Sequence, residues 1–347
     1  MSLGVAVDLG TANTVTYVWG RGVVVDEPSA IAMNRRDGRT VAVGAAAKQM
    51  LGRTPDHLEV LCPLEDGTVA NLSACEKMLR VFLRRVSERR WWRPRVVVCV
   101  PSRATELGRH AVQEAAEFAG ARKPVHLIEE PVAAAIGARM PIGSALGNLI
   151  VDVGGGTTEV AVLSLGGVVA SSSVRIAGNH FDQAIVAFCR KEYGLGIGQG
   201  TAEYVKTRYA CAWPLREEGY VDVRGVDLVD GGPKTITVST VELREAIEEP
   251  LAGICDAVRD TLEGTPPELV ADAGHAIGVP GHLPDVEHRV GPLGGGPLRR
   301  GDRFGPALIE ARGRHLHHPA AHRDRQIRAT LGDEGVHHFG RTFSEAK

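Results

Sequence analysis

The sequence predicts an α/β fold made of two similar halves. The first observation behind this prediction is a repeat: a strand, an aspartate, a glycine-rich turn and a second strand occur around Asp8 and again around Asp152. The second is that each copy is followed by segments in which apolar residues recur every three to four positions, the spacing of amphipathic helices. Strands and helices that alternate in this way are typical of α/β proteins.

The first half opens with three short strands joined by tight turns, at 3–9, 13–19 and 22–25. Strand-like pieces follow over 30–45, where the charged turn RRDGRT separates them. The apolar patterns next predict a helix at 73–88, a strand at 95–101, a helix at 104–120 and a strand at 125–131. Gly120 is expected to end the second helix, and a helix of small residues, VAAAIGA, follows the last strand.

The second half repeats the opening pattern over 148–174. The elements predicted after it are helices at 180–194 and 201–212, strands within 219–240, and one long helix or two over 239–264. Ser239 or Thr240 is the expected N-cap of the last helical stretch, because a hydroxyl there can accept a hydrogen bond from a free amide of the first turn.

The residue pattern of the sequence changes after Leu269. Apolar periodicity is lost there, and nine of the thirteen histidines follow. No clean strand is expected between 272 and 290. Three histidines cluster further on, at His315, His317 and His318, but no matching carboxylates or cysteines accompany them, which argues against a specific metal site.

Composition narrows the class of protein. A chain of 347 residues can bury a large core as one domain or two, and a net charge of -2 gives no bulk attraction to nucleic acid. Six cysteines without C-x-x-C spacing indicate free thiols in a reducing compartment. No apolar run reaches 18 residues and no signal peptide precedes the first strand, so we expect a soluble, cytoplasmic protein that can still touch a membrane surface.

The two glycine-rich turns have the chemistry of a phosphate clamp. Backbone amides at a glycine-rich hairpin converge on a small volume that suits phosphate oxygens, and the absence of Cβ atoms lets the anion approach. The aspartate ending each preceding strand can hold a hydrated Mg²⁺ between carboxylate and phosphate. The alternative is two ordinary tight turns, which the repetition of the aspartate makes less favourable. The sequence contains no Walker A motif. A Rossmann fingerprint is excluded because both turns lead into strands and not into helices.

Longer stretches around these turns resemble a known family. The segments VDLGTANTVTYV, VPSRATELGRHAVQEAAEFAGARKPVHLIEEPVAAAIGA and VDVGGGTTEVAVLSLGGVVASSSVRIAGNHFDQAI are similar to the actin-like ATPase superfamily and, within it, to the MreB family of bacterial actin homologues. GTAEYVKTRYACAWP and EPLAGICDAVRDTLEGTPPEL continue the resemblance, which runs from residue 3 to about 269.

The resemblance implies an actin-like ATPase fold, with two lobes of duplicated origin and four subdomains around a nucleotide cleft. It places the first lobe at 1–145, with a small subdomain at about 32–66. It places the second lobe at 146–290, with a small subdomain at about 182–240, and leaves 291–347 as a divergent segment. ATP and Mg²⁺ are the implied cofactors. The implied activity is slow ATP hydrolysis coupled to head-to-tail assembly of filaments that lie on the cytoplasmic membrane and organise wall synthesis proteins and cell shape.

Site residues follow from the same resemblance, position by position. The phosphate and metal contacts it implies are Asp8, Gly10, Thr11, Ala12 and Asn13 in the first hairpin, and Asp152, Gly154, Gly155, Gly156 and Thr157 in the second. Glu130 corresponds to the residue that orients the attacking water. The alternative for Glu130 is an acidic pair with Glu129, favoured by a helix dipole.

Contacts with the nucleoside are also implied. Glu203 and Lys206 are expected to face it, although a solvated ion pair between the two, one helical turn apart, is the alternative. Gly294 and Gly295 resemble the glycines that hold the adenosine, yet they lie farther along the chain than the family pattern expects. This departure leaves open a nucleotide-poor static scaffold of the same family. Arg103, where the family has glycine, is a second departure.

One further segment, SERRWWRPR at 87–95, is predicted to be a surface loop that contacts a membrane. Trp91 and Trp92 are flanked by arginines, and tryptophan and arginine together favour an anionic membrane surface. The alternative is a local cation–π cluster. A different class of function, a small-molecule kinase of the same superfold, also uses two hairpins, but no acceptor-site motif is recognisable in the sequence.

Overall fold

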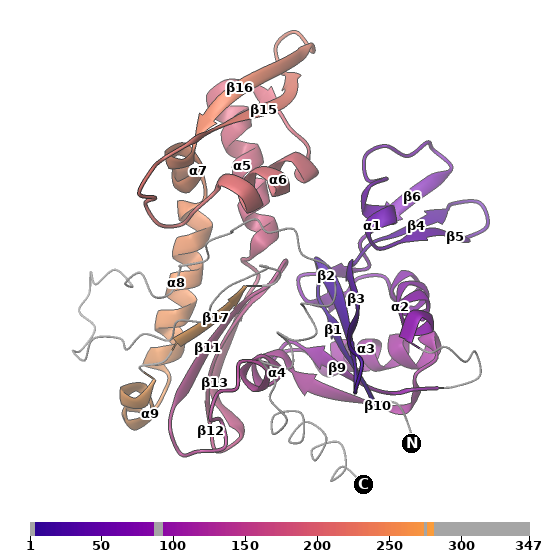
Figure 1. Cartoon of the computed structure of the whole chain (residues 1–347), viewed down its shortest axis with the longest axis vertical. Coiled ribbons are helices and arrows are strands. Elements are labelled where there is room, and N and C mark those ends of the chain that lie inside the picture. Colours follow the sequence, from indigo (N-terminus) through magenta and orange to yellow (C-terminus); the bar gives the residue numbers. More distant parts are fainter. Residues whose placement is uncertain (1–3, 87–92, 274–275, 281–347) are drawn as a thin grey trace.

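Two β-sheets form the framework of the chain (Figure 1). The computed structural model describes residues 4–86, 93–273 and 276–280. The first sheet has the strand order β10-β9-β1-β2-β3. Its strands are β1 (Gly4–Leu9), β2 (Asn13–Val18), β3 (Gly22–Pro28), β9 (Arg95–Val100) and β10 (Arg122–Glu129). The three strands β1, β9 and β10 run parallel, while β1, β2 and β3 form the predicted antiparallel meander.

Helices α2 (Leu72–Val86) and α3 (Glu106–Ala119) share one hydrophobic core with this sheet. Alternate residues of β1 enter the core, as period-two strands require, and α2 adds a buried stripe that includes Met78 and Phe82. Thr105 caps α3 by accepting a hydrogen bond from the amide of Gly108, and Gly120 ends it in the left-handed conformation. The helix predicted at 104–120 is therefore confirmed, and the helix predicted at 73–88 is confirmed as far as Val86, the last described residue there.

A small sheet extends from the first half, with the order β5-β4-β6. It consists of β4 (Ile31–Asn34), β5 (Thr40–Val43) and β6 (Leu58–Leu61), and the short helix α1 (Ala45–Lys48) packs on it. A two-stranded ribbon, β7 (Leu64–Glu65) and β8 (Thr68–Val69), returns the chain to α2.

The sheet of the second half has the order β13-β12-β11-β17. Its strands are β11 (Asn148–Val153), β12 (Thr158–Ser164), β13 (Gly167–Val174) and β17 (Ala276–Pro280). Helix α8 (Glu248–Glu263) and α9 (Pro267–Asp272) pack against one face, whereas α4 (Glu130–Gly137) contributes to a separate core with β11 and β12. Figure 1 shows α4 between the two sheets.

The strand β17 corrects the expectation that no clean strand lies between 272 and 290. Residues Ala276–Pro280 pair in parallel with β11, from Leu149↔Ala276 to Val153↔Pro280. The segment is short and contains Gly278 and Pro280, so its residue pattern alone gives a weak strand signal. Its backbone pairing with β11 is what makes it a strand.

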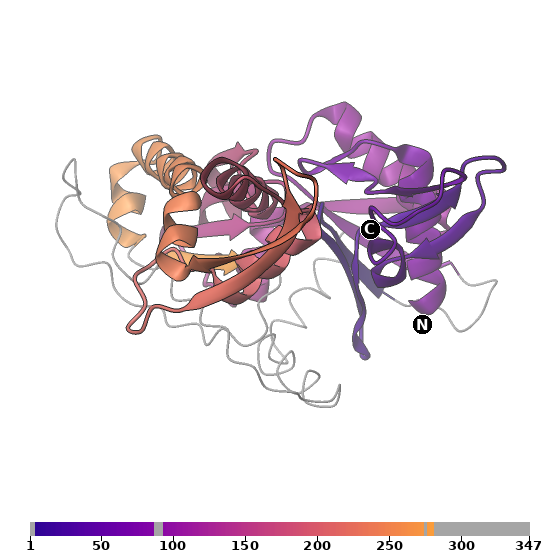
Figure 2. The ribbon, with the colours of Figure 1, turned by 90° about the horizontal axis from the view of Figure 1, so that it is seen from above.

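A second small sheet, β14-β15-β16, stands beyond the second half. It comprises β14 (Leu195–Gly196), β15 (Tyr220–Asp227) and β16 (Pro233–Ser239), and it shares a core with α5 (Gly178–Tyr193), α6 (Gln199–Tyr209) and α7 (Thr240–Ala246). Figure 2 shows the two halves side by side, seen from above. In Figure 1 the small sheet of each half lies in the upper part of the view.

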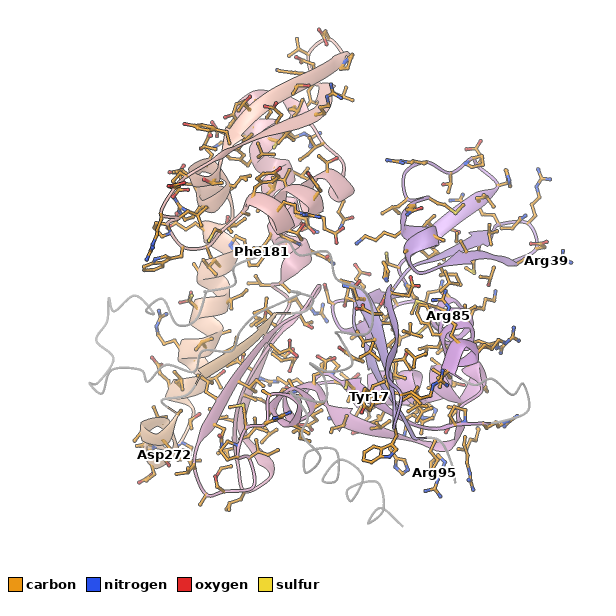
Figure 3. The ribbon with its side chains drawn as sticks, viewed as in Figure 1. Tyr17, Arg39, Arg85, Arg95, Phe181 and Asp272 are labelled. Atoms are coloured by element: carbon orange, nitrogen blue, oxygen red, sulfur yellow. The ribbon has the colours of Figure 1, made fainter. Side chains whose placement is uncertain are left out.

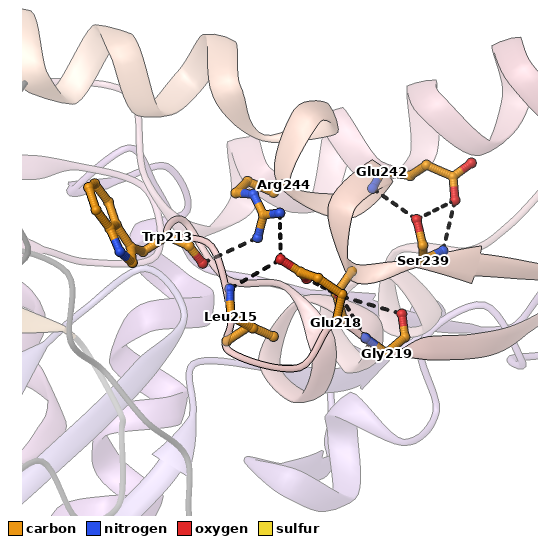
Figure 4. A network of polar contacts seen from close by, with 8 residues as sticks. Trp213, Leu215, Glu218, Gly219, Ser239, Glu242 and Arg244 are labelled. Atoms are coloured by element: carbon orange, nitrogen blue, oxygen red, sulfur yellow. Dashed lines mark hydrogen bonds and ion pairs between the residues drawn. The ribbon is translucent and has the colours of Figure 1, made fainter.

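Polar contacts fix the join between β16 and α7 (Figure 4). Ser239 is the N-cap, and it exchanges hydrogen bonds with Glu242 in a capping box, which confirms one of the two predicted caps. Glu218 accepts from Arg244 at 2.7 Å and from the amide of Leu215 at 3.1 Å. The stretch predicted as one long helix or two is two, because Pro250 lacks the amide that a continuous helix would need there.

Across the described part of the chain, no helix is both long and apolar enough to cross a membrane. All six cysteines lie within that part and carry free thiols, as the sequence predicts.

Candidate functional site

The parallel strands of the first sheet bring three predicted site segments to one edge. Val7 of β1 lies opposite Val98 of β9, and Val100 of β9 lies opposite Glu129 of β10. The carboxyl ends of these strands therefore coincide, and ligands of α/β sheets bind at such edges. Asp8, the segment after Val100, and Glu130 all reach this edge.

The two hairpins have the same internal closure. In the first, the amide of Gly10 donates to the carbonyl of Asn13 at 3.1 Å, and in the second the amide of Gly154 donates to the carbonyl of Thr157 at 2.9 Å. Each turn follows a strand that carries an aspartate, on β1 and on β11. The repeat predicted from the sequence thus recurs in the backbone hydrogen bonds.

The hairpins also face each other at close range. A Cβ added to Gly155 would lie 2.5 Å from the Cβ of Ala12, and one added to Gly156 would lie 2.8 Å from Oγ1 of Thr11. Real Cβ atoms do not come this close to other heavy atoms, so only glycine permits the approach of the second hairpin to the first. Backbone amides of both turns consequently border one small volume.

Carboxylates gather beside the hairpins and change one another's pKa. Burial raises the pKa of Asp152 to about 7, and the charges of Asp8 and Glu159 add to the increase. Burial also raises the pKa of Glu130 well above its usual range, with further contributions from Asp8, Glu159 and Asp152. The thiol of Cys99 feels the same charges, since burial together with Asp8 and Glu130 raises its pKa.

Mutual repulsion of this kind identifies a place where a cation is favourable, because a bound positive charge lets the carboxylates ionise. Within the described ranges, however, no three histidine, cysteine or acidic side chains converge closely enough to bind a bare ion. A cation that keeps most of its water, such as Mg²⁺, needs only one or two carboxylate ligands from a protein. Asp8 and Asp152, each on a strand that leads into a hairpin, are the two carboxylates that the sequence analysis expects beside such a cation.

Glu159 is a member of this cluster that sequence reasoning did not single out. It lies on β12, directly opposite Asp152, and its side chain is 1% exposed. A signal was present, because Glu159 is the sole acidic residue in the segment TEVAVLS, whose other residues are apolar or hydroxyl-bearing. A charge on a strand that is buried along its whole length calls for a specific role.

Glu130 opens helix α4, and the dipole alternative predicts that its charged form is stabilised there. Its raised pKa has the opposite sign, so burial and the neighbouring carboxylates outweigh the dipole at this position. Glu129, the N-cap residue, instead bonds to Arg109 at 3.3 Å. The two acids are therefore not equivalent.

Glu203 and Lys206 have separate partners. Lys206 contacts the carboxylate of Asp182 at 2.8 Å and the carbonyl of Gly178 at 2.7 Å, beside the second hairpin. Glu203 bonds to Lys48 at 2.7 Å, from helix α6 to helix α1 of the other half. The alternative of an ion pair between Glu203 and Lys206 is therefore not the arrangement that the structure shows.

Several predicted residues lie outside the described ranges: Trp91, Trp92, Gly294 and Gly295, together with the histidine cluster at 315–318. Arg103 is described and its side chain is exposed. It does not crowd the interior of the loop that follows β9.

Comparison with known proteins agrees with this geometry. A model of the family described as MreB/Mbl protein matches residues 2–281. The cell shape-determining protein MreB of Escherichia coli (strain K12) is 50% identical over 273 residues, which is 77% of this chain and 78% of that protein. The cell shape-determining protein Mbl of Bacillus subtilis (strain 168) is 43% identical over 269 residues, with 77% and 80% covered.

Solved structures give the same result. MreB5 of Spiroplasma citri bound to AMPPNP superimposes with a TM-score of 0.75 at 38% identity, covering 80% of this chain and 85% of that one. A filament structure of MamK, at 22% identity and a TM-score of 0.68, shares the fold. The family match over residues 2–281 spans both sheets and both hairpins. The chain belongs to the MreB/Mbl family and has its actin-like ATPase fold.

Proposed function

We propose that this protein is an ATP-dependent, actin-like cytoskeletal protein that assembles into membrane-associated filaments and organises cell-wall synthesis and cell shape. The observation that carries the proposal is the pair of facing hairpins with a carboxylate cluster beside them. Two relatives with this fold provide further support, since one is named a cell shape-determining protein and another was solved with AMPPNP and with ADP.

In this proposal the phosphates of ATP lie against the backbone amides of the two hairpins, formed by Gly10, Thr11, Ala12 and Asn13 and by Gly154, Gly155, Gly156 and Thr157. Asp8 and Asp152 hold a hydrated Mg²⁺. The chemistry that the metal supplies when bound is neutralisation of phosphate charge. Glu130 accepts a hydrogen bond from a water and orients it toward the terminal phosphate, which is most of what a protein contributes to phosphoryl transfer.

Glu203 and Lys206 are proposed to contact the nucleoside, with Gly294 and Gly295 completing the pocket. The position of Lys206, bonded to Gly178 next to the second hairpin, supports its part of the proposal. The half-buried ion pair between Glu203 and Lys48 spans from one half of the chain to the other, and we propose that it opens during nucleotide exchange.

The lobes are proposed to divide near residue 145, with the divergent segment from 291. The small sheets at 31–61 and 195–239 support the proposed small subdomains at about 32–66 and 182–240. Assembly is proposed to run head to tail between copies of the chain, in contact with wall-synthesis proteins and without nucleic acid.

The membrane is proposed to contact the end of the first sheet from which the 87–92 segment departs. Arg21 donates to the carbonyl of Val86 at 2.9 Å, which ties the turn after β2 to the last residue before that segment. Trp19, in the same turn, is 42% exposed. An exposed tryptophan here adds to the predicted pair Trp91 and Trp92 as a membrane-interface group.

Basic residues line the same end of the sheet. Arg95 lies opposite both Gly4 and Arg122 in the strand register, and Figure 3 shows Arg95 at this end. The exposed side chains of Arg93 and Lys123 lie beside these strands in sequence. A row of this kind favours the anionic, cytoplasmic surface of a membrane, at about 1 kcal/mol for each basic residue near the lipid.

Sedimentation with ATP, with ADP and without nucleotide tests the central proposal. ATP is expected to increase the pelleted fraction, while chelation of Mg²⁺ reverses the increase. Assembly that ignores nucleotide, combined with no measurable ATP binding, would instead favour the static scaffold of the same family. Phosphate release that depends on an added sugar or acetate would favour a kinase.

Co-sedimentation with anionic liposomes tests the membrane contact. The double variant Trp91→Ala, Trp92→Ala is expected to lose liposome binding, because membrane binding by a filament is the sum of many weak contacts and the variant removes each of them. The same variant is expected to keep ATP-dependent assembly. Trp213→Ala removes an exposed tryptophan from the second half and serves as the matched control. Equal binding by the double variant and the control would exclude this loop as the anchor.

A further inference from the structure

A direct hydrogen bond joins the two halves next to the carboxylate cluster. Ser102 follows strand β9 of the first half, and Glu159 lies on β12 of the second. Oγ of Ser102 donates to Oε2 of Glu159 at 2.5 Å, and the backbone amide of Ser102 donates to the same oxygen at 3.2 Å. One carboxylate oxygen therefore accepts two hydrogen bonds from the other half of the chain.

The burial of Glu159 makes this contact unusual. The side chain is 1% exposed, and its second oxygen, Oε1, has no hydrogen-bond partner among the described residues. Burying a carboxylate that is satisfied on one side only is unfavourable for stability. An apolar residue would fit the rest of β12 better, since every position of that strand is buried. A functional reason for the acid is therefore the simpler account.

The strand registers place this hydrogen bond between two proposed site residues. Ser102 follows Val100, which is paired with Glu129, so it lies beside the start of α4 and Glu130. Glu159 is paired directly with Asp152. Glu159 also contributes to the raised pKa of both Glu130 and Asp152, which shows that its charge lies near each of them.

We propose that Ser102 and Glu159 are positioning residues for ATP hydrolysis. Their hydrogen bond fixes the loop after β9, and with it the neighbouring Glu130, relative to the second hairpin. The water-orienting carboxylate is thereby held in a fixed position relative to the second hairpin and to the phosphates it is proposed to bind. This inference rests on the proposed function, and it adds two residues that set the position of Glu130 relative to the second hairpin.

A positioning role differs from a purely structural one in what it changes. Loss of a merely structural contact would lower the free energy of unfolding and would leave hydrolysis at saturating ATP unchanged. Loss of a positioning contact lowers the rate at saturating ATP and leaves ATP affinity nearly unchanged, because small displacements of an orienting group cost rate rather than binding.

The test compares Ser102→Ala, Ser102→Thr and Glu159→Gln with the parent chain. Ser144→Ala is the matched control, because the hydroxyl of Ser144 donates only to the nearby carbonyl of Pro141. We measure phosphate release at saturating ATP, ATP affinity by titration, and hydrogen exchange of the Ser102 amide. Ser102→Ala is expected to release phosphate about 10-fold more slowly with ATP affinity within about 2-fold of the parent. Ser102→Thr, which keeps the hydroxyl, is expected to restore most of the rate.

Glu159→Gln is expected to keep an acceptor oxygen for Ser102, and so to keep the slow exchange of the Ser102 amide. Parental phosphate release by Ser102→Ala would overturn the inference, and so would fast exchange of this amide in the parent. A parent that assembles with ATP but releases no phosphate would overturn this inference alone. A parent that neither binds ATP nor assembles would overturn the proposed function itself.

Discussion

The two hairpins share one design but have different supports. The first is braced by hydroxyls of its own half: Ser29 donates to the carbonyl of Gly10 at 2.6 Å, and Thr11 accepts from the amide of Gly67 at 3.0 Å. The second is braced by a helix, since the amides of Gly178 and Asn179 at the start of α5 donate to Gly154 and Gly155. The first hairpin is thus held by loop residues, and the second by the N-terminus of a helix.

The aspartates differ along with the supports. Asp8 is exposed, whereas Asp152 is half-buried, lies opposite the buried Glu159 and has a pKa of about 7. The two halves therefore share the turn and its closing hydrogen bond, while the electrostatic surroundings of their aspartates differ. The half with the helix dipole and the buried acids is the one whose charge state depends more on a bound cation. Four experiments test whether the two hairpins differ in function and in stability.

Glu130 is expected to give the largest effect, because it is the proposed water-orienting group at the edge of the first sheet. Glu130→Gln should lower the rate of phosphate release by about 100-fold and leave ATP binding intact, which single-turnover and titration experiments measure. Glu129→Gln makes the same charge change one residue away and breaks the contact with Arg109 instead. Equal losses in the two variants would contradict a specific role for Glu130.

Lys206 is expected to give the next effect, on stability. Lys206→Met leaves Asp182, whose side chain is 3% exposed, without its cation, and removal of one partner from a buried pair costs about 3 kcal/mol in free energy of unfolding. Lys48→Met is the control, because its partner Glu203 is 35% exposed, and such a surface pair contributes at most about 1 kcal/mol. Urea denaturation measures both, and similar losses would show that the support of the second hairpin is not special.

Gly155 tests the approach of the hairpins to each other. Gly155→Ala places a methyl group 2.5 Å from Ala12, so the hairpins must separate, and ATP affinity should fall by about 10-fold. Gly10→Ala produces its contact inside its own turn, 2.8 Å from the carbonyl of Asn13. Gly200→Ala, with open space around the added methyl, should bind ATP as the parent does. Parental affinity in Gly155→Ala would show that the hairpins do not act as a pair.

The raised pKa of Asp152 predicts that the free energy of unfolding changes with pH by about 1–2 kcal/mol in metal-free buffer. The pKa of Asp152 rises from 3.8 in the unfolded chain to about 7 in the folded one. The folded chain therefore binds the proton more tightly between pH 4 and 7, and the free energy of unfolding falls as the pH rises through this range. Asp152→Asn abolishes this contribution, so its stability advantage over the parent should grow from pH 5 to pH 8.

Thermal unfolding across this pH range, with EDTA, measures the Asp152 effect. Addition of Mg²⁺ at pH 8 should stabilise the parent and have less effect on Asp152→Asn, since the metal neutralises the ionised carboxylate. Asp222→Asn, on an exposed position of β15, is the control. A constant difference between variant and parent at all pH values would contradict the assigned pKa.

Features that depend on near neighbours along the chain could be predicted from the sequence. The repeated strand, aspartate and glycine-rich turn, the helical spacing around Met78 and the cap at Ser239 all follow from residues within a few positions of one another. Such patterns reflect backbone sterics, side-chain periodicity and local hydrogen bonds, which act at short range along the chain. Family resemblance added the expected roles of the hairpin residues, which remain predictions.

Contacts between distant segments are seen in the tertiary structure and could not be predicted from the sequence. The bond between Ser102 and Glu159 joins residues 57 positions apart, and that between Lys48 and Glu203 joins residues 155 positions apart. Strand β17 likewise depends on β11, far before it in the chain. Which carboxylates are buried together, and so how their pKa values shift, follows from how the sheets pack, because desolvation and Coulomb energies depend on distances in space rather than on sequence separation.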